Sequence, residues 1–357
     1  MNAGEASIEW LFSEQLRVDE EWSIRTPTGF KWWADKNAQT VELIGEETDP
    51  DGNTGYLISV RTEFLRDLEL NYESLDSPSP QAYLVDRYTM RFATMAGPVY
   101  DAASRTLDLC SLVRVHEGIS SWINPLISVA AVLQIDWIRT TPALVVEALN
   151  AQEATSGHPE HGMRPEPDEM AEIVESLIAP EGGEPCRWTA SEFQSVVDEY
   201  MNKPPSLFGS AGDLGFTVEF PYGEEGSSLF QVKGDVPHPR YGNGLFMLQS
   251  FHLVEDPDQP GSGARMALFF NSAELGDMPQ GYGFGSYSFR DDKLHFTSFF
   301  PNLAYSPGLL PNIYFAAAQR ARMVSRTLAN HDWDEGSFSP RRSAVGRMID
   351  WSENEES

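Results

Sequence analysis

The sequence predicts an α+β protein made of two similar units, and three observations support this prediction. The chain has 357 residues, a length at which one hydrophobic core normally divides into two domains. Hydrophobic residues make up 41% and charged residues 22%, as in globular domains. A strand followed by a helix occurs near the middle of the chain and again near its end. We expect each unit to run helix, three strands, helix, two strands, helix, with an antiparallel sheet packed against helices.

The repeat rests on two segments that match in phase. Apolar and small residues alternate in both, the period-two pattern of a strand with one buried face. The matched positions are Leu107, Leu109, Ser111 and Val113 in the first segment and Leu294, Phe296, Ser298 and Phe300 in the second. Each following helix has a proline near its start, Pro125 or Pro311, where a missing N–H costs little. Duplication explains this agreement, although any two strand-then-helix segments share some of it.

The first unit is expected to cover residues 1–150. An amphipathic helix opens it, and the strands and helices that follow are inferred from the spacing of apolar residues. In order, they are a helix at 8–16, strands at 23–34, 40–46 and 55–62, a helix at 81–94, a hairpin at 99–113 and a closing helix from 121.

The second unit is expected to cover residues 189–329. Thr189 with Glu192 three residues later is typical of a capped helix start. The remaining elements are a helix at 191–201, strands at 216–220, 229–233 and 245–254, a helix at 264–275, a hairpin at 283–300 and a closing helix from 307.

Two segments lie outside the expected units. Residues 151–188 are rich in Pro, Gly and Glu and are predicted to be a linker. A short amphipathic helix is expected inside it, on the apolar spacing of Met170, Ile173, Val174 and Leu177. Residues 330–357 are a polar tail, which we expect to be partly disordered.

This order of elements resembles the bacterial type III secretion chaperone-like fold, particularly its YbjN-type branch. The segments GFKWWADKNAQTVELIG, LDLCSLVRVHEGIS and LHFTSFFPN carry the resemblance together with the helix after each late hairpin. It would cover nearly the whole chain twice, and it implies small-sheet domains that bind protein segments and carry no catalytic residues. The tandem arrangement departs from the family, whose members are usually dimers of single units.

The charge of the chain excludes some partners. The sequence has 25 Lys and Arg against 54 Asp and Glu, a net charge of −29, which repels phosphate backbones and anionic lipids. We therefore expect no nucleic acid partner and no membrane insertion. The acidity indicates either solubility and salt adaptation or a surface that attracts basic partners.

Cysteine usage and the N-terminal sequence indicate a cytoplasmic protein. Only Cys110 and Cys186 are present, which predicts neither a disulfide framework nor a metal cluster. The N-terminal residues lack the pattern of a secretion signal, and no later segment is expected to be long enough to cross a bilayer.

Candidate chemistry in the sequence is sparse. Three features were weighed: the histidines of His158-Pro159-Glu160-His161, the glycines of Gly281-Tyr282-Gly283-Phe284-Gly285, and the pairs His116 with Glu117 and His252 with Glu255. The histidines lie in the expected linker without further ligands, and the glycines precede a strand, whereas phosphate loops precede a helix. Common catalytic motifs do not occur. We therefore predict no enzyme activity, no cofactor and no metal; the alternative is an enzyme of unrecognised type with a cleft between two lobes.

Aromatic pairs supply the candidate binding residues. Adjacent strand residues face opposite sides of a sheet, so one residue of each pair should lie on the outer face, which is either covered by a helix or offered to a partner. The candidates are Trp32, Trp33, Phe269, Phe299 and Phe300. The predicted function is non-catalytic protein or peptide binding, chaperone- or adaptor-like, by a monomer whose halves pair as an internal pseudo-dimer. An immunity or scaffold protein is a further alternative.

Overall fold

The computed structural model has the mixed composition of an α+β protein, with helices packed on two antiparallel sheets. This confirms the predicted class. The structure describes residues 1–48, 54–70, 80–89, 94–140, 142–172, 184–201, 208–212, 214–222, 226–252, 261–277 and 282–330. The predicted tail of residues 330–357 lies almost wholly outside these ranges.

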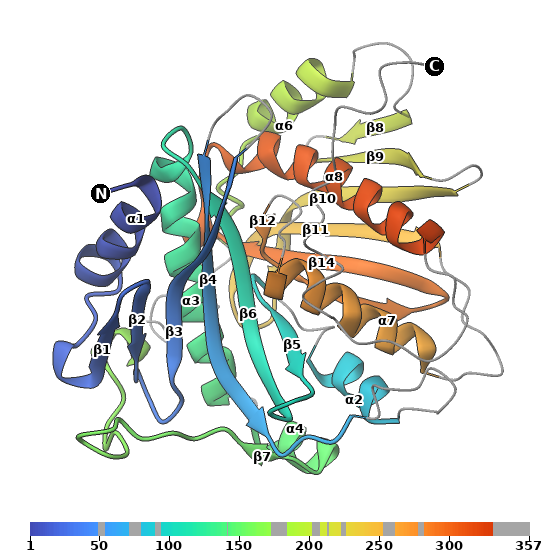
Figure 1. The fold of residues 1–357 in the computed structure, drawn as a ribbon. Coiled ribbons are helices and arrows are strands. Elements are labelled where there is room, and N and C mark those ends of the chain that lie inside the picture. Colours follow the sequence, from blue (N-terminus) through green and yellow to red (C-terminus); the bar gives the residue numbers. More distant parts are fainter. Residues whose placement is uncertain are drawn as a thin grey trace.

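The first sheet is formed mainly by the N-terminal half of the chain, drawn in blue to teal in Figure 1. Its strands are β1 (Ser23–Thr26), β2 (Gly29–Trp32), β3 (Gln39–Thr48), β4 (Thr54–Arg66), β5 (Gly97–Asp101), β6 (Thr106–Val115), β7 (Gln152–Glu153) and β12 (Tyr282–Gly283). The order is β1-β2-β3-β4-β6-β12, with β5 also paired to β6 and β7 to β4.

The second sheet, yellow to orange in Figure 1, crosses beside the first at a steep angle. Its strands are β8 (Phe208–Gly212), β9 (Gly215–Tyr222), β10 (Gly226–His238), β11 (Gly242–His252), β13 (Ser286–Arg290) and β14 (Lys293–Pro301). They are ordered β13-β14-β11-β10-β9-β8, and every neighbouring pair is antiparallel.

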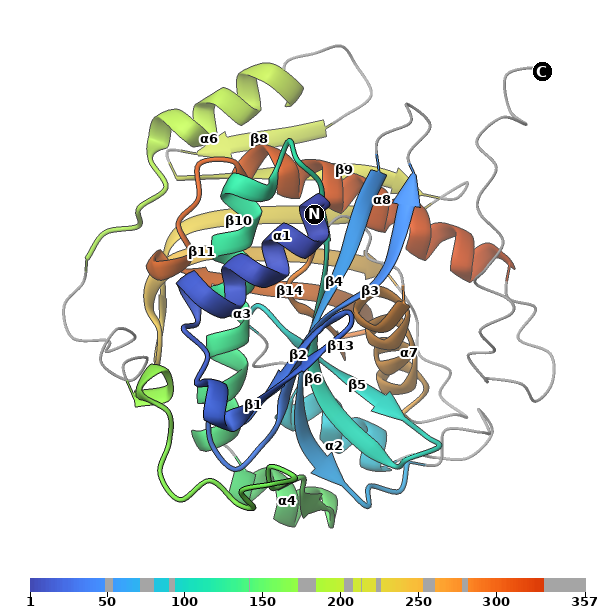
Figure 2. The same ribbon diagram turned by 60° about the vertical axis from the view of Figure 1, so that its left-hand side comes forward.

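Helices cover these sheets. They are α1 (Ala3–Trp10), α2 (Pro80–Tyr88), α3 (Ser120–Thr140), α4 (Pro142–Leu149), α6 (Ala190–Val196), α7 (Ser262–Asn271) and α8 (Leu309–Asn330). Figures 1 and 2 show α1 and α3 beside the first sheet and α7 and α8 against the second. A single hydrophobic core runs through both halves.

Each half has four strands before its middle helix, where the sequence predicted three. In the first half, the expected strand at residues 23–34 is a hairpin of β1 and β2. Pro27 follows β1 and cannot donate a ladder hydrogen bond, which favours the turn. In the second half, β8 precedes β9 and pairs with it.

The halves exchange short segments across their boundary. Tyr282 and Gly283 of β12 pair with β6 of the first sheet. In the opposite direction, the Thr94 carbonyl accepts hydrogen bonds from the Phe299 backbone N–H and the Ser298 hydroxyl, each at 3.1 Å. The two exchanges lie at corresponding places, since both precede the late hairpin of the half that supplies them.

Further contacts fill the boundary between the halves. The middle helices α2 and α7 pack together, and β5 contacts β13. The Asp86 carboxylate of α2 accepts a 2.7 Å hydrogen bond from the Phe289 backbone N–H of β13. Leu275 packs with Val99 and Cys110 in a small buried cluster. The described residues of the two halves therefore meet in a packed interface.

The expected linker is partly ordered on the first half. Residues 152–153 form β7 against β4, and the Ala154 N–H donates to the Phe64 carbonyl at 2.9 Å. The Arg164 guanidinium donates to the Asp19 carboxylate at 2.9 Å and to the Trp33 carbonyl at 2.8 Å. Residues 169–172 are helical, and the rest of the predicted short helix, from Ile173, lies outside the described residues.

Helix α3 corrects one expectation. At 21 residues, it is long and apolar enough to cross a membrane, the one such helix among the described residues, although no such segment was predicted. In the fold, 72% of its most apolar stretch is buried, and it contacts both halves through Gln134 on the first sheet and Asp136 on Arg240. Its apolar surface is used in the core.

Candidate functional site

Four of the five predicted binding residues are buried and do not form an exposed surface. Trp32, Trp33, Phe299 and Phe300 are between 0% and 3% exposed. Both members of each strand pair are covered by side chains from other segments. Trp33 lies 4.9 Å from the His158 ring of the expected linker, and Phe299 lies 4.9 Å from the His238 ring. Of the two outcomes expected for the outer residue, covered or offered to a partner, both strand pairs show the covered one.

Phe269 and Phe270 lie on helix α7, within the helix expected at 264–275, so the strand alternation applied to this pair does not hold. Phe270 is fully buried, and Phe269 is half-buried against the core and lies 5.4 Å from the Phe270 ring.

The histidines of the expected linker form an ordered aromatic cluster. The His158 and His161 rings stack at 4.7 Å, and Trp22 lies at the edge of both. Reciprocal backbone hydrogen bonds between His158 and Gly162 close the loop. Within the described ranges, no group of three or more His, Cys, Asp or Glu side chains is arranged to hold a metal ion.

A buried charged network lies under α8 in the second half. Arg320 makes a bidentate ion pair with Glu274, with a shortest distance of 2.6 Å, and both side chains are fully buried. The Tyr287 hydroxyl donates to the same carboxylate at 2.7 Å, and burial raises the pKa of this phenol far above its usual value. Because all three groups are sealed from solvent, the network serves packing and not chemistry on a ligand.

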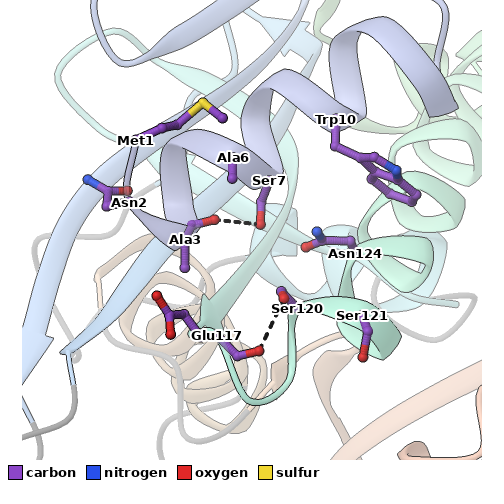
Figure 3. Close-up of a pocket in the computed structure, with 10 residues that line it drawn as sticks. All are labelled: Met1, Asn2, Ala3, Ala6, Ser7, Trp10, Glu117, Ser120, Ser121 and Asn124. Carbon is purple, nitrogen blue, oxygen red and sulfur yellow. Dashed lines mark hydrogen bonds between the residues drawn. The ribbon is translucent and has the colours of Figure 1, made fainter.

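An open pocket of about 470 Å³ lies between α1 and the start of α3. Figure 3 shows ten of the residues that line it. They are Met1, Asn2, Ala3, Ala6, Ser7 and Trp10 from the N-terminal segment and Glu117, Ser120, Ser121 and Asn124 from the β6–α3 turn and α3. The volume falls in the range of small-ligand sites.

Local structure explains how the walls are held. Asn2 caps α1, with its side-chain oxygen accepting from the Glu5 N–H at 2.8 Å and the Glu5 carboxylate accepting from the Asn2 N–H at 2.9 Å. Gly4 packs against Leu43 and Tyr56, where a Cβ would approach their side chains to 2.7 Å. A larger residue at Gly4 would push α1 away from the sheet and widen the pocket.

Two of the three serine hydroxyls that line the pocket donate to the backbone. Ser7 donates to the Ala3 carbonyl at 2.8 Å, and Ser120 donates to the Glu117 carbonyl at 3.3 Å, as drawn in Figure 3. Neither hydroxyl donates to a histidine or a carboxylate that could activate it as a nucleophile.

Asn124 is the unusual residue of the pocket. It is 9% exposed, yet its Oδ1 atom is buried without a hydrogen-bond partner among the described residues. Figure 3 places its amide between Ser7 and Ser120, facing the cavity. An unpaired buried carbonyl costs about 1–3 kcal/mol, so this position is poorly suited to a purely structural role.

The pocket offers two acceptors and an aromatic ring. Glu117 is exposed and supplies a carboxylate, Asn124 supplies the unpaired carbonyl, and Trp10 supplies a half-buried aromatic ring. None of the ten lining residues is Lys, Arg, His or Cys, and the one cationic group of the lining is the Met1 ammonium, which lies 3.9 Å from the Glu5 carboxylate. This arrangement can accept hydrogen bonds and stabilise a positive group, and it lacks a base paired with a nucleophile.

The sequence predictions missed this pocket. Only Glu117 had been singled out, as half of an acid–base pair with His116, and Glu255 of the other weighed pair lies outside the described residues. The sequence did contain a signal for Asn124. The residue before the helix proline is Asn124 in the first unit and Leu310, which is buried, in the second.

Comparisons with known proteins give no relatives: no family model, no curated protein and no solved structure matches the chain.

Proposed function

We propose that the chain is a non-catalytic protein- or peptide-binding module, chaperone- or adaptor-like, made of two copies of one α+β unit. The copies would comprise residues 1–150 and 189–329. The proposal of two copies is supported by strand order. Reading outward from the late hairpin, the first sheet runs β5-β6-β4-β3-β2-β1 and the second β13-β14-β11-β10-β9-β8.

The register of the strands supports the same alignment. Val60 of β4 pairs with Ser111 of β6, and Met247 of β11 pairs with Ser298 of β14. Ser111 and Ser298 are the serines already matched in sequence, so both central strands keep one register relative to the hairpin.

Two glycines give independent support. Gly29 starts β2 and Gly215 starts β9, in corresponding strands. A Cβ on Gly29 would lie 2.0 Å from the Val41 carbonyl oxygen, and one on Gly215 would lie 2.6 Å from that of Val232. Only glycine tolerates this approach of backbone, so the same constraint occurs at the same place in both halves.

Internal pairing is supported by the packed boundary between the halves. Each half supplies a segment to the other, at Thr94 in one direction and at Tyr282 and Gly283 in the other. Reciprocal contacts of this kind are typical of two-fold dimers. We propose that the two fused halves pair with each other within one chain and that the protein is a monomer. A tethered partner has an effective concentration on the order of millimolar, which favours pairing within the chain over pairing between chains.

The observation that carries the binding function is the open pocket with the unpaired Asn124 carbonyl. Two of its three serine hydroxyls donate to backbone carbonyls and its lining has a single carboxylate, a set that favours recognition over catalysis. The packed boundary leaves this pocket, outside the interface, as the better candidate than a groove between the halves.

Affinity capture from the native cytosol tests the proposed function. The full chain is used as bait, together with light scattering of the free protein. We expect a stoichiometric protein partner and a free mass close to 39.9 kDa. A retained metabolite or metal with no protein would support the alternative, an enzyme of unrecognised type. A dimer that persists on dilution would contradict internal pairing.

A further inference from the structure

We infer that the pocket between α1 and α3 receives the cationic side chain of a Lys or Arg residue from a protein partner. The inference rests on the proposed binding function and names the chemistry that the site recognises. Three features of the pocket carry it: its unpaired acceptor, its charge and its aromatic wall.

The unpaired acceptor is the Asn124 oxygen. It lies buried in the wall of the cavity between Ser7 and Ser120, so an N–H group of a ligand completes its hydrogen bonding once the amide turns toward the cavity. A carbonyl oxygen accepts from a donor and repels an anion. A ligand that reaches this oxygen must therefore bring hydrogen-bond donors, as an ammonium or guanidinium group does.

The carboxylate and the overall charge favour a cation. Glu117 adds a full negative charge at the rim, and the chain as a whole carries −29. Three contributions oppose it. The starts of α1 and α3 each carry about half a positive charge, which is screened within one turn. The Met1 ammonium lies 3.9 Å from the Glu5 carboxylate, which offsets it.

The aromatic wall is Trp10. It is half-buried on α1 and borders the cavity beside Asn124 in Figure 3. Tryptophan is the aromatic side chain that best stabilises a cation over its face. A long aliphatic stem can pack on the same ring while its charged end reaches Glu117.

The second half supplies a matched replacement for the test. At the position corresponding to Asn124, α8 has Leu310, which is 1% exposed in the core. Asn124→Leu removes an unpaired buried polar group and should leave the folded state at least as stable as before. Loss of binding in this variant would therefore not arise from unfolding.

The experiment measures fluorescence anisotropy of labelled twelve-residue peptides with the full-length chain. One peptide contains Arg and Lys, the second has citrulline and acetyl-lysine at those positions, and the third has Glu. The second peptide keeps the length and the hydrogen-bonding shape while removing the charge. Binding is measured at low and high salt for the wild type and for Asn124→Leu, Glu117→Gln and Glu147→Gln. Glu147 is exposed on α4 and controls for the loss of one negative charge.

We expect the basic peptide to bind at least tenfold more tightly than its neutral counterpart and the acidic peptide not to bind. Asn124→Leu should weaken binding about tenfold with an unchanged or raised melting temperature. Glu117→Gln should weaken it several-fold and reduce its salt dependence, whereas Glu147→Gln should leave it unchanged.

The inference is overturned if neutral and basic peptides bind equally, or if Asn124→Leu raises stability while binding stays within twofold. If no peptide binds while affinity capture yields a stoichiometric partner, the inference fails and the proposed function stands. If no peptide binds and affinity capture yields no protein partner, both the inference and the proposed function fail.

Discussion

Helices α3 and α8 each have a buried polar residue at the corresponding position, and the two residues differ in charge and in their partners. Gln134 of α3 accepts a 2.7 Å hydrogen bond from Thr62 and donates one of 3.0 Å to Ser111. Under the proposed alignment, Arg320 takes its place in α8, and Gln249 takes the place of Thr62. Arg320 lies 3.5 Å from Gln249 but makes its main contacts with Glu274. In the first half the buried polar residue of the helix thus makes neutral hydrogen bonds to the sheet, whereas in the second it makes an ion pair with Glu274 in the helical turn that follows α7.

A second pair of positions shows how the same burial acts on opposite charges. Asp108 of β6 and His295 of β14 are each 7% exposed. Burial raises the pKa of the Asp108 carboxyl to about 6 and lowers the pKa of the His295 imidazole. Both groups are shifted toward their neutral forms, because desolvation penalises whichever form is charged. Burial at these corresponding sites therefore shifts both pKa values, upward for the acid and downward for the base.

The largest expected effect is at the buried ion pair. Arg320→Gln gives the second half the residue of the first but leaves Glu274 buried without its partner. We expect a loss of about 3–5 kcal/mol in the free energy of unfolding, measured by urea denaturation. Gln134→Leu in the first half should cost only about 1–2 kcal/mol, since it leaves neutral groups unpaired.

The double variant Arg320→Leu with Glu274→Leu is the control for this comparison. It removes both charges together and should recover most of the stability that Arg320→Gln loses. A double variant as unstable as the single one would show that the arginine stem, and not its charge, stabilises the second half.

An intermediate effect is expected at the paired glycines. Gly29→Ala and Gly215→Ala force a Cβ against a backbone oxygen and should each cost about 2–3 kcal/mol by thermal or urea unfolding. The loss at Gly29 should be the larger, because its approach is the closer. Gly45→Ala is the control, with Leu57 at 3.7 Å as its nearest neighbour. Equal tolerance at all three positions would contradict the shared backbone constraint.

The smallest effect near neutral pH is the pH dependence of stability, which is confined to acid pH. The folded pKa of Asp108 is raised, so its contribution is complete below its unfolded value near 3.8 and is lost as pH rises through about 6. Asp108→Asn should remove this loss, about 3 kcal/mol between these limits. The measurement is urea unfolding at several pH values.

His295 should show the opposite trend. Its folded pKa is lowered, so its contribution is present above the unfolded value near 6.5 and declines as pH falls below it. His295→Gln should flatten the acid side of the stability profile and leave the alkaline side unchanged. Identical profiles for the two variants would break the comparison between these positions.

The sequence predicted the elements with strong periodicity. The late hairpins and closing helices are where the alternating and helical patterns placed them, because most of their buried residues are apolar and recur at the period of the element. Strands β1 and β8 were missed as separate elements. The first is only four residues long, with polar side chains that carry little pattern.

The site could not be predicted because its parts come together only through packing. Trp10 and Asn124 are more than one hundred residues apart, and each has an ordinary role when read alone. Burial of the aromatic pairs was equally hidden, since the residues that cover Trp33 and Phe299 come from distant segments. The alternating pattern of a strand predicts which face of the sheet a residue lies on, but it does not predict which segment covers that face.

The exchanged segments have a consequence for how the protein folds. Gly283 pairs with Leu112 across roughly 170 residues of chain, so this contact forms only after a very long loop closes. Neither half can complete its sheet contacts before the other has been synthesised. We expect slow folding and a single cooperative unfolding transition for both halves. While only the first half has emerged from the ribosome, the edge of β6 that pairs with β12 has no partner strand.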